Sequence, residues 1–217
     1  MRDTNESYRI HHADCLEINA VEPESLFDLI YLEPEASISS EELAVRVSSL
    51  LPHLTEEGFL LLHADVERAH AYKSILDVFG LPFKGDVIWC YRQRAVKTKA
   101  LQNHRDTILV YSANPHYYPK RHLLAQPLVG PSSAERVGLS GQKPMELYKR
   151  LFRFFERYHR IATVLDPMMG SGSALVAALE QGRTVTGFDT SLEACRITEN
   201  RLRLAIPASQ QLVMELE

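Results

Sequence analysis

Short apolar runs alternate with longer amphipathic stretches along the whole chain. Seven of these runs are rich in β-branched and aromatic residues and are bounded by polar or turn residues, a pattern typical of β-strands. They are Tyr8–His12, Phe27–Leu32, Gly58–Ala64, Val87–Tyr91, Thr107–Ser112, Ala162–Asp166 and Thr184–Asp189. Because helical patterns separate most of them, we predict an α/β fold with a doubly wound, mostly parallel seven-stranded sheet.

The helices between these strands have recognisable ends. Ser39 is followed three positions later by Glu42, which is the capping-box pattern at a helix start. A second helix is predicted over 65–79, where Gly80 ends it. A third is predicted to begin near Pro144. Its apolar face is expected to comprise Leu147, Leu151, Phe154, Phe155 and Tyr158.

Residues 114–141 break the alternation of strands and helices. They contain four prolines together with glycines and serines, and they show little periodicity. We predict a long loop or small insert here, and loops of this length usually carry function. The whole chain, 1–217, is otherwise predicted to be a single domain.

Composition narrows the class of protein. The chain has 217 residues, of which 45% are hydrophobic and 24% charged, as in an ordinary globular protein. Its net charge of −4 means that any nucleic-acid contact needs a local basic patch. The three cysteines and nine histidines show no metal-ligand spacing, so no metal or disulfide is expected and the histidines are interpreted as surface or packing residues. No apolar run could span a membrane, and a cytoplasmic protein is expected.

A glycine-rich turn near the carboxyl end is the first candidate site. The segment 164–175 reads as a strand, a turn through Gly170 and Gly172, and the start of a helix. Glycine lets a polar ligand approach free backbone N–H groups at such a turn. The next strand ends at Asp189, whose carboxylate suits a ribose diol. The pair predicts a nucleoside-cofactor site, and the alternative is a tight turn without a ligand.

Two carboxylates follow an apolar strand in the first quarter of the chain. Glu33-Pro34-Glu35 comes directly after Leu32, at the end of the strand predicted over 27–32. Ligands of doubly wound sheets lie outside the carboxyl ends of the strands, so this is a second candidate site. The alternative is a solvated turn whose backbone is fixed by Pro34.

Basic residues gather in two places in a chain that is acidic overall. Residues 91–105 hold five of them and no acid, and a smaller cluster lies in the segment 114–141. Basic residues interleaved with Tyr, Gln and Asn are typical of phosphate and base contacts, although an ordinary solvated loop has a similar composition. The candidate DNA-binding residues are Arg92, Arg94, Lys97, Lys99, Arg105, Lys120 and Arg121.

The order of these stretches resembles that of the β-type, or permuted, amino-group DNA methyltransferases, which use S-adenosylmethionine. Asp14 and Cys15 resemble the family's opening segment beside the cofactor adenine. Lys143 and Pro144 resemble the segment that closes over the methionine end. The resemblance implies a Rossmann-like methyltransferase fold. It also implies cofactor contacts at Asp14, Cys15, Lys143, Pro144, Asp166, Pro167, Met168, Gly170, Gly172 and Asp189.

The target-base motif departs from the family. There, Asp, Asn or Ser followed by Pro-Pro-aromatic accepts the N–H bonds of an exocyclic amine and stacks on the flipped base. In this chain the four positions read Glu33, Pro34, Glu35 and Ala36. Glu33 is one methylene longer than Asp, and the missing ring removes a stacking contact of about 1–3 kcal/mol. By resemblance, the catalytic residues are Glu33, Pro34 and Glu35.

Two hypotheses follow for function. The first is a site-specific DNA methyltransferase of the restriction-modification kind, acting on adenine N6 rather than cytosine N4 because the first motif position is acidic. The second is a catalytically inactive relative that binds cofactor, DNA or both as a recognition or regulatory partner. A nicotinamide-dependent enzyme fits poorly, since Leu175 occupies the third glycine position. Double-stranded DNA is the expected partner, with a homodimer or a partner subunit sharing recognition.

Overall fold

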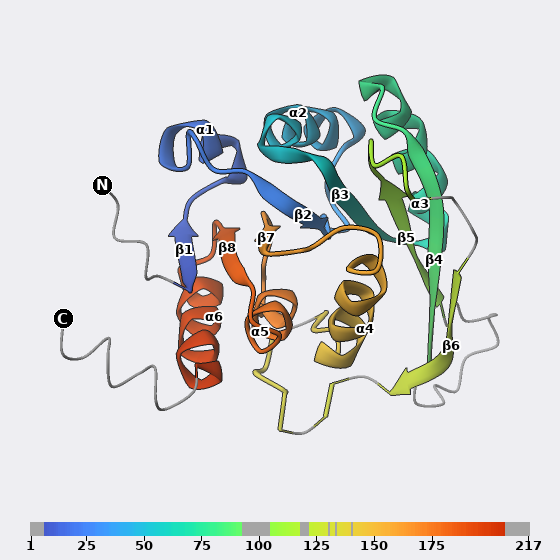
Figure 1. Ribbon diagram of the computed structural model, residues 1–217. Coiled ribbons are helices and arrows are strands. Elements are labelled where there is room, and N and C mark those ends of the chain that lie inside the picture. The colour runs from blue at the N-terminus through green and yellow to red at the C-terminus, as the bar shows by residue number, and fades with distance from the viewer. Residues whose placement is uncertain are drawn as a thin grey trace.

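Eight strands form one sheet in the order β1-β8-β7-β2-β3-β5-β4-β6 (Figure 1). The computed structural model describes residues 7–92, 105–117, 122–129, 131–132, 134–139 and 141–206, with main chain only at 91–92 and 122–129. The strands are β1 (Tyr8–His12), β2 (Phe27–Leu32), β3 (Leu54–Asp65), β4 (Phe83–Arg92), β5 (Arg105–Tyr111), β6 (His122–Val129), β7 (Thr163–Asp166) and β8 (Thr184–Asp189).

The sheet is mostly parallel. All pairings among β1, β8, β7, β2 and β3 are parallel, as is that of β4 with β6. The strand β5 runs antiparallel to both of its neighbours, β3 and β4. The predicted doubly wound, mostly parallel architecture is confirmed.

The sheet has eight strands, one more than the seven that the sequence predicted. All seven predicted strands are present, and the eighth, β6, lies in the segment 114–141 that was predicted to be irregular. Pro127 within the run 122–129 argued against a strand, because proline cannot donate to the hydrogen-bond ladder. An edge strand tolerates proline because one side of it has no partner strand, and β6 occupies the edge of the sheet.

Helices cover both faces of the sheet (Figure 1). The helices α1, α2 and α3 lie on one face, and α4, α5 and α6 lie on the other. Their bounds are α1 (Ile18–Val21), α2 (Ser40–Leu50), α3 (Val66–Leu76), α4 (Met145–Phe155), α5 (Ser173–Leu179) and α6 (Leu192–Ala205). Short 3₁₀ turns occupy Cys15–Glu17, Leu51–His53 and Asp77–Phe79. The capping box of Ser39 and Glu42 is present at the start of α2.

Two hydrophobic cores result from the alternation of side chains along the strands. In β2, Leu29 and Tyr31 pack towards α4 and α5, whereas Ile30 and Leu32 pack towards α1, α2 and α3. A strand places successive side chains on opposite faces, so the central strands are apolar at nearly every position. Glu33 continues the alternation beyond Leu32 and falls on the α4 side of the sheet.

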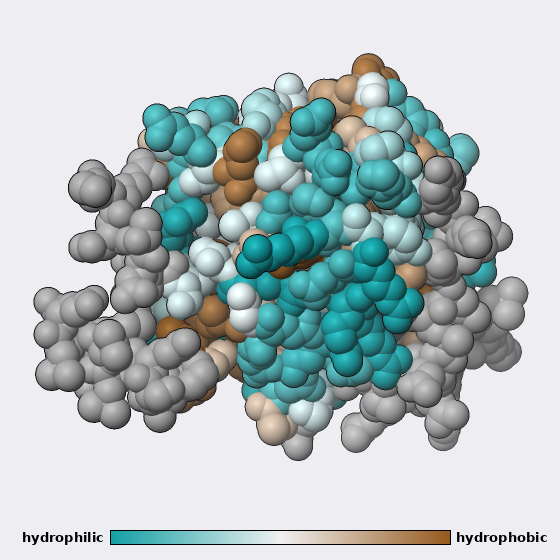
Figure 2. All heavy atoms as spheres, viewed as in Figure 1, coloured by the Kyte–Doolittle hydropathy of each residue, from teal (hydrophilic) through white to brown (hydrophobic). Residues whose placement is uncertain are grey.

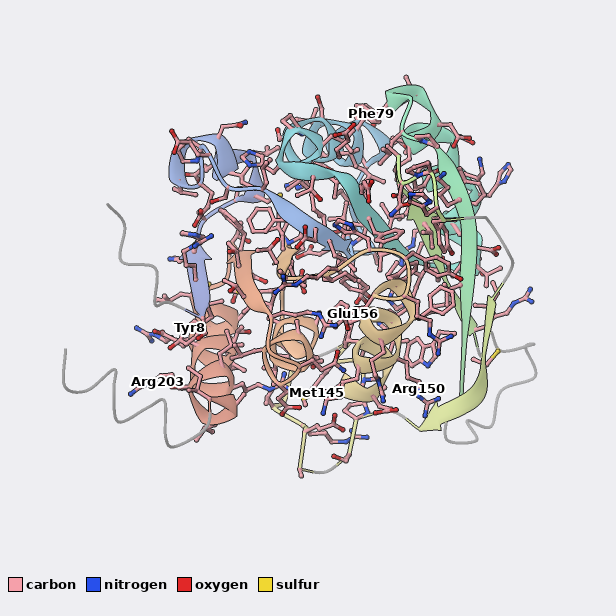
Figure 3. All side chains as sticks on the ribbon, viewed as in Figure 1. Tyr8, Phe79, Met145, Arg150, Glu156 and Arg203 are labelled. Atoms are coloured by element: carbon pink, nitrogen blue, oxygen red, sulfur yellow. The ribbon has the colours of Figure 1, made fainter. Side chains whose placement is uncertain are left out.

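The helix α4 buries a broader face than the one predicted, and this face includes the predicted Leu147, Leu151 and Phe155. Met145 is its first residue, and Glu156 is the residue after its end (Figure 3). Tyr148 and Phe152 join the predicted leucines in the core, while Phe154 is only partly buried. The buried stripe is broad because α4 packs against both the sheet and α5. Hydrophilic residues cover the opposite, solvent side of α4 (Figure 2).

Within the described ranges, no helix has the length and apolar character needed to cross a membrane.

Candidate active site

A pocket of about 840 Å³ opens at the carboxyl ends of β1, β2, β7 and β8. Its volume is in the range of cavities that hold small ligands and cofactors. The predicted catalytic residues Glu33, Pro34 and Glu35 all line it. Eight of the predicted cofactor residues line the same pocket, namely Asp14, Cys15, Lys143, Asp166, Pro167, Met168, Gly170 and Asp189. The tertiary structure therefore brings both predicted sites into one cavity.

The other two predicted cofactor residues, Pro144 and Gly172, do not line the pocket. Gly172 has a φ of +68°, and a Cβ there would lie 2.4 Å from Cγ2 of Thr198. Gly170 has a φ of +50° with no atom within 4 Å of the position of a Cβ. Gly172 thus allows α6 to approach the turn, while Gly170 leaves the space above the turn open. Pro144 is buried and precedes α4.

Two carboxylates mark the end of the pocket beside β1 and β8. Asp189 accepts hydrogen bonds from the backbone N–H of Gly170 at 2.9 Å and of Ser191 at 2.8 Å. Asp14 accepts one from the N–H of Leu16 at 3.0 Å and pairs with Arg46 at 3.1 Å. The sequence did not reveal Arg46, which comes from α2. These bonds hold both carboxylates at the pocket wall, where their free lone pairs can accept ligand hydroxyls.

Asp166 forms part of the floor of the pocket and is only 4% exposed. Burial raises the pKa of its carboxyl well above the usual value. The hydrogen bond from the N–H of Met168 opposes this, but the negative Glu33 and Asp189 raise the pKa further. Carboxylates outnumber cations among the described lining residues. The carboxylates are Asp14, Glu33, Glu35, Glu42, Asp166 and Asp189, and the cationic side chains are Arg46, Arg68 and Lys143. The charge of the pocket thus favours a cationic ligand.

Glu33 lies between two basic side chains, Lys143 and His63. Its Oε1 lies 2.7 Å from Nζ of Lys143, and its Oε2 lies 3.7 Å from Nδ1 of His63. Burial by itself would raise the pKa of Glu33, but His63 and Lys143 outweigh it and hold the pKa below the usual value. Burial would likewise lower the pKa of Lys143, but Glu33 raises it. Glu33 is therefore a carboxylate at neutral pH.

His63 and Asp106 lie behind Glu33 and were not predicted as site residues. His63 is only 2% exposed, and its Nε2 lies 3.1 Å from Oδ2 of Asp106. The histidines were interpreted as surface or packing residues. His63 is buried and packs beside Trp89, and it also contacts two carboxylates. One signal was available in the sequence, because His63 is the one titratable side chain in the apolar run 59–64.

The remaining motif positions are more open. Pro34 is buried, whereas Glu35 and Ala36 are exposed. Nη1 of Arg68 donates to the carbonyl of Glu35 at 3.3 Å, and the same guanidinium pairs with Asp65 at 2.6 Å. No aromatic side chain is present at position 36, so the stacking surface of the family motif is missing there.

The predicted DNA-binding residues lie mostly outside the described residues. This holds for Arg94, Lys97, Lys99, Lys120 and Arg121, and for the side chain of Arg92. Arg105 is described and is exposed at the start of β5. Whether these residues form one basic surface stays a prediction.

Comparison with known proteins identifies the family. The sequence pattern of the N6/N4-methyltransferase family, described as DNA methylase, matches residues 40–200. The chain belongs to this family of amino-group DNA methyltransferases. The matched region holds the glycine-rich turn, Lys143 and Asp189, but it begins after Glu33. Membership therefore rests on residues 40–200 and leaves the altered target-base motif untested.

Solved structures of other methyltransferases share the fold of this chain. The M1.HpyAVI–SAM complex is 20% identical with a TM-score of 0.74, covering 90% of this chain and 98% of that one. TTHA0409 from Thermus thermophilus, complexed with S-adenosyl-L-methionine, is 19% identical with a TM-score of 0.68, covering 93% and 95%. The cytosine-N4-specific PvuII DNA methyltransferase is 14% identical with a TM-score of 0.70, covering 98% and 94%.

No curated protein sequence matches this chain. The predicted cofactor is the one that the family uses, and two of the structures named above were solved with it.

Proposed function

We propose that this chain binds S-adenosylmethionine in the 840 Å³ pocket and transfers its methyl group to an exocyclic amine of a base in DNA, adenine N6 rather than cytosine N4. One observation carries the proposal. Glu33, at the first position of the target-base motif, is ionised and lies in the same pocket as the turn at Gly170 and the carboxylate of Asp189. The methyl acceptor and the methyl donor would thus share one cavity.

The residues of the pocket fit the cofactor. Asp189 and Asp14 present carboxylate oxygens that suit ribose hydroxyls and the adenine side of a nucleoside. The open space at Gly170 lets a ligand approach the backbone of the turn. The excess of carboxylates favours a ligand with positive charge such as a sulfonium with an α-ammonium group.

The chemistry at the acceptor side follows from Glu33 and Pro34. When bound, the cofactor supplies an electrophilic methyl group on a positively charged sulfur. The carboxylate of Glu33 and the carbonyl of Pro34 can accept the two N–H bonds of the amine and orient its lone pair. As the N–C bond would form and the S–C bond to the methyl group would break, with its electron pair left on sulfur, the amine would become more acidic, and ionised Glu33 can take the proton that it releases. Positioning of this kind can supply much of the rate.

A second function is favoured by a specific observation at the same motif. Glu35 and Ala36 offer no ring for a flipped base, and Glu33 is already paired with Lys143 at 2.7 Å. Both features would suit a catalytically inactive member of the family that binds cofactor or DNA as a recognition or regulatory partner. Glu35 also adds a negative charge where a phosphate backbone would approach.

Measuring methyl transfer to DNA together with cofactor binding distinguishes the two functions. Labelled S-adenosylmethionine is incubated with genomic DNA and the full chain, and cofactor binding is followed by calorimetry. The proposal expects label in N6-methyladenine and a binding constant for the cofactor. Cofactor binding without transfer to DNA would favour the inactive function, and label in N4-methylcytosine would correct the target. A Glu33→Gln variant serves as the control for background transfer.

The family acts on DNA, so we also propose which residues of this chain contact it. The basic residues from Arg92 to Arg105, with Lys120 and Arg121, are proposed to contact the phosphate backbone. A single domain over 1–217, a homodimer or a partner subunit that shares recognition, and a cytoplasmic location all stay predictions.

A further inference from the structure

A line of polar side chains runs beneath the acceptor side of the pocket, on the α4 face of the sheet. Tyr31 and Glu33 alternate along β2 and its end, and His63 is two residues beyond Leu61 on β3. Asp106 comes from β5, whose Ile108 pairs with His63 in the sheet. Because β2, β3 and β5 are adjacent, side chains from three separate parts of the chain meet at one level.

His63 lies at the centre of this line. Its Nε2 is 3.1 Å from Oδ2 of Asp106, which fixes the orientation of the ring. On the other side, Nδ1 is hydrogen-bonded to the hydroxyl of Tyr31 and faces Oε2 of Glu33 at 3.7 Å. The ring of Trp89, from β4, covers it edge-on at 5.8 Å. A histidine at 2% exposure that contacts two acids is built into the site and is not a surface residue.

Glu33 needs such support because its side chain is one methylene longer than Asp and has one more torsion to fix. Lys143 holds only Oε1, at 2.7 Å. A second anchor on the side of Oε2 would set the plane of the carboxylate. An ionised carboxylate has about four lone-pair sites, so two anchors still leave room for the N–H of an amine.

We propose that His63, oriented by Asp106, is a positioning residue that fixes the Glu33 carboxylate for the methyl acceptor. The proposal rests on the function proposed above and adds two residues to the site. The charged and titratable groups that face this network are Tyr31 and Glu33 from β2 and its end, Asp106 from β5, Asp166 from β7, Lys143 before α4 and Tyr148 in α4. Asp65 also lies at the end of β3 but pairs with Arg68.

The pKa of Glu33 in the ligand-free chain provides a test that does not depend on activity. It is measured by carbon-13 NMR titration of the Glu33 carboxyl in four proteins: wild type, His63→Gln, Asp106→Asn and the control His53→Gln. His53 is equally buried at 3% but bonds only to Ser25 and Asn19, away from the pocket.

Replacing His63 by Gln removes the strongest influence that lowers the pKa of Glu33, so this pKa should rise by about 1 or more. Asp106→Asn should lower the pKa of Glu33, since the negative charge of Asp106 raises it in the wild type. His53→Gln should leave the pKa unchanged. An unchanged pKa of Glu33 in folded His63→Gln would overturn the proposal. If that variant does not fold, an unchanged value in Asp106→Asn does the same.

The kinetics of wild type and His63→Gln test what His63 contributes to methyl transfer. If the wild-type protein transfers methyl groups, His63→Gln should lower kcat about 10- to 100-fold while the KM for S-adenosylmethionine stays the same. The acid limb of the pH profile of kcat should also move to higher pH, because the pKa of Glu33 rises. A variant with unchanged kcat and pH profile would refute the positioning role. Absence of transfer by the wild type would instead count against the proposed function, and the NMR titration would still test His63.

Discussion

The ammonium of Lys143 lies 2.7 Å from Oε1 of Glu33, although 110 residues separate the two in the sequence. Glu33 follows β2, and Lys143 precedes α4, which packs on the same face of the sheet. The ion pair therefore joins the first position of the target-base motif to the segment that resembles the cofactor-closing region of the family. It also holds Glu33 in its ionised form.

This ion pair should show strong coupling in a double-mutant cycle. Lys143→Met leaves the Glu33 carboxylate without its closest cation, and we expect a loss of about 1–2 kcal/mol in the free energy of unfolding, between the values for exposed and fully buried pairs. Glu33→Gln combined with Lys143→Met should recover most of this loss, because no charge is left unpaired. Urea denaturation of the four proteins gives the coupling. Strictly additive losses would contradict an energetically significant pair.

The same pair predicts how stability depends on pH. Glu33 has a folded pKa below its usual value of 4.5, so its contribution is complete above pH 4.5 and is lost as the pH falls through the lowered pKa. Lys143 has a folded pKa above 10.5, so its contribution is complete below pH 10.5 and is lost as the pH rises through the raised value. Melting temperatures of Glu33→Gln should fall less steeply in acid than those of wild type. The exposed Glu24→Gln is the control and should follow the wild-type curve.

The two glycines of the turn should differ in their effects: Gly172 should matter for the free energy of unfolding, and Gly170 for cofactor binding. Gly172→Ala places a methyl group 2.4 Å from Thr198 at a positive φ, and we expect a loss of about 2–4 kcal/mol in unfolding free energy. Gly170→Ala meets no atom and should cost only about 1–2 kcal/mol of backbone strain. Its methyl group borders the pocket, so calorimetry should show weaker cofactor binding.

Gly182→Ala is the matched control for Gly170→Ala. Its φ is +79°, its Cβ would also meet no atom, and it does not line the pocket. It should carry the same strain with unchanged cofactor affinity. Equal affinity in Gly170→Ala and Gly182→Ala would remove the turn from the cofactor site.

Restoring the family motif should strengthen binding of the target base and raise methyl transfer. Ala36→Tyr adds a stacking surface of about 1–3 kcal/mol, so binding of DNA that carries an unpaired target adenine should tighten about 5- to 150-fold. Ala36→Leu adds bulk without a π face and should give little of this gain. The triple change Glu33→Asp, Glu35→Pro, Ala36→Tyr should raise methyl transfer from labelled cofactor. Tight binding of both ligands by the triple variant without transfer would mean that the defect lies elsewhere.

Removing positive charges from the basic stretch 91–105 tests whether it contacts DNA. Replacing Arg92, Arg94, Lys97 and Lys99 by Gln should weaken DNA binding and reduce the slope of log K against log salt by about 0.9 for each phosphate that the variant no longer neutralises. Four exposed arginines elsewhere, Arg153, Arg157, Arg160 and Arg196, provide a control of equal charge. Identical salt slopes in the two quadruple variants, measured by fluorescence anisotropy, would exclude the stretch as a specific DNA contact.

Much of the fold and half of the site could be predicted from local patterns. The strands β2, β7 and β8, the capping box of Ser39 and the turn at Gly170 each depend on residues close together in the chain, so their periodicity and turn chemistry show directly in the sequence. The strand β6 was missed because the signal that decides it is its place at the sheet edge, where Pro127 is tolerated.

By itself, the sequence determined the alternation of strands and helices, the glycine turn and the acids that end β2 and β8. Strand order and the packing of α4 decided what surrounds those acids. Lys143, His63 and Asp106 meet at Glu33 only because β2, β3 and β5 are neighbours and α4 covers their shared face. Hydrophobic patterning shows which face of a strand is buried, but it does not show which buried polar groups will be neighbours, because that depends on pairing between distant segments.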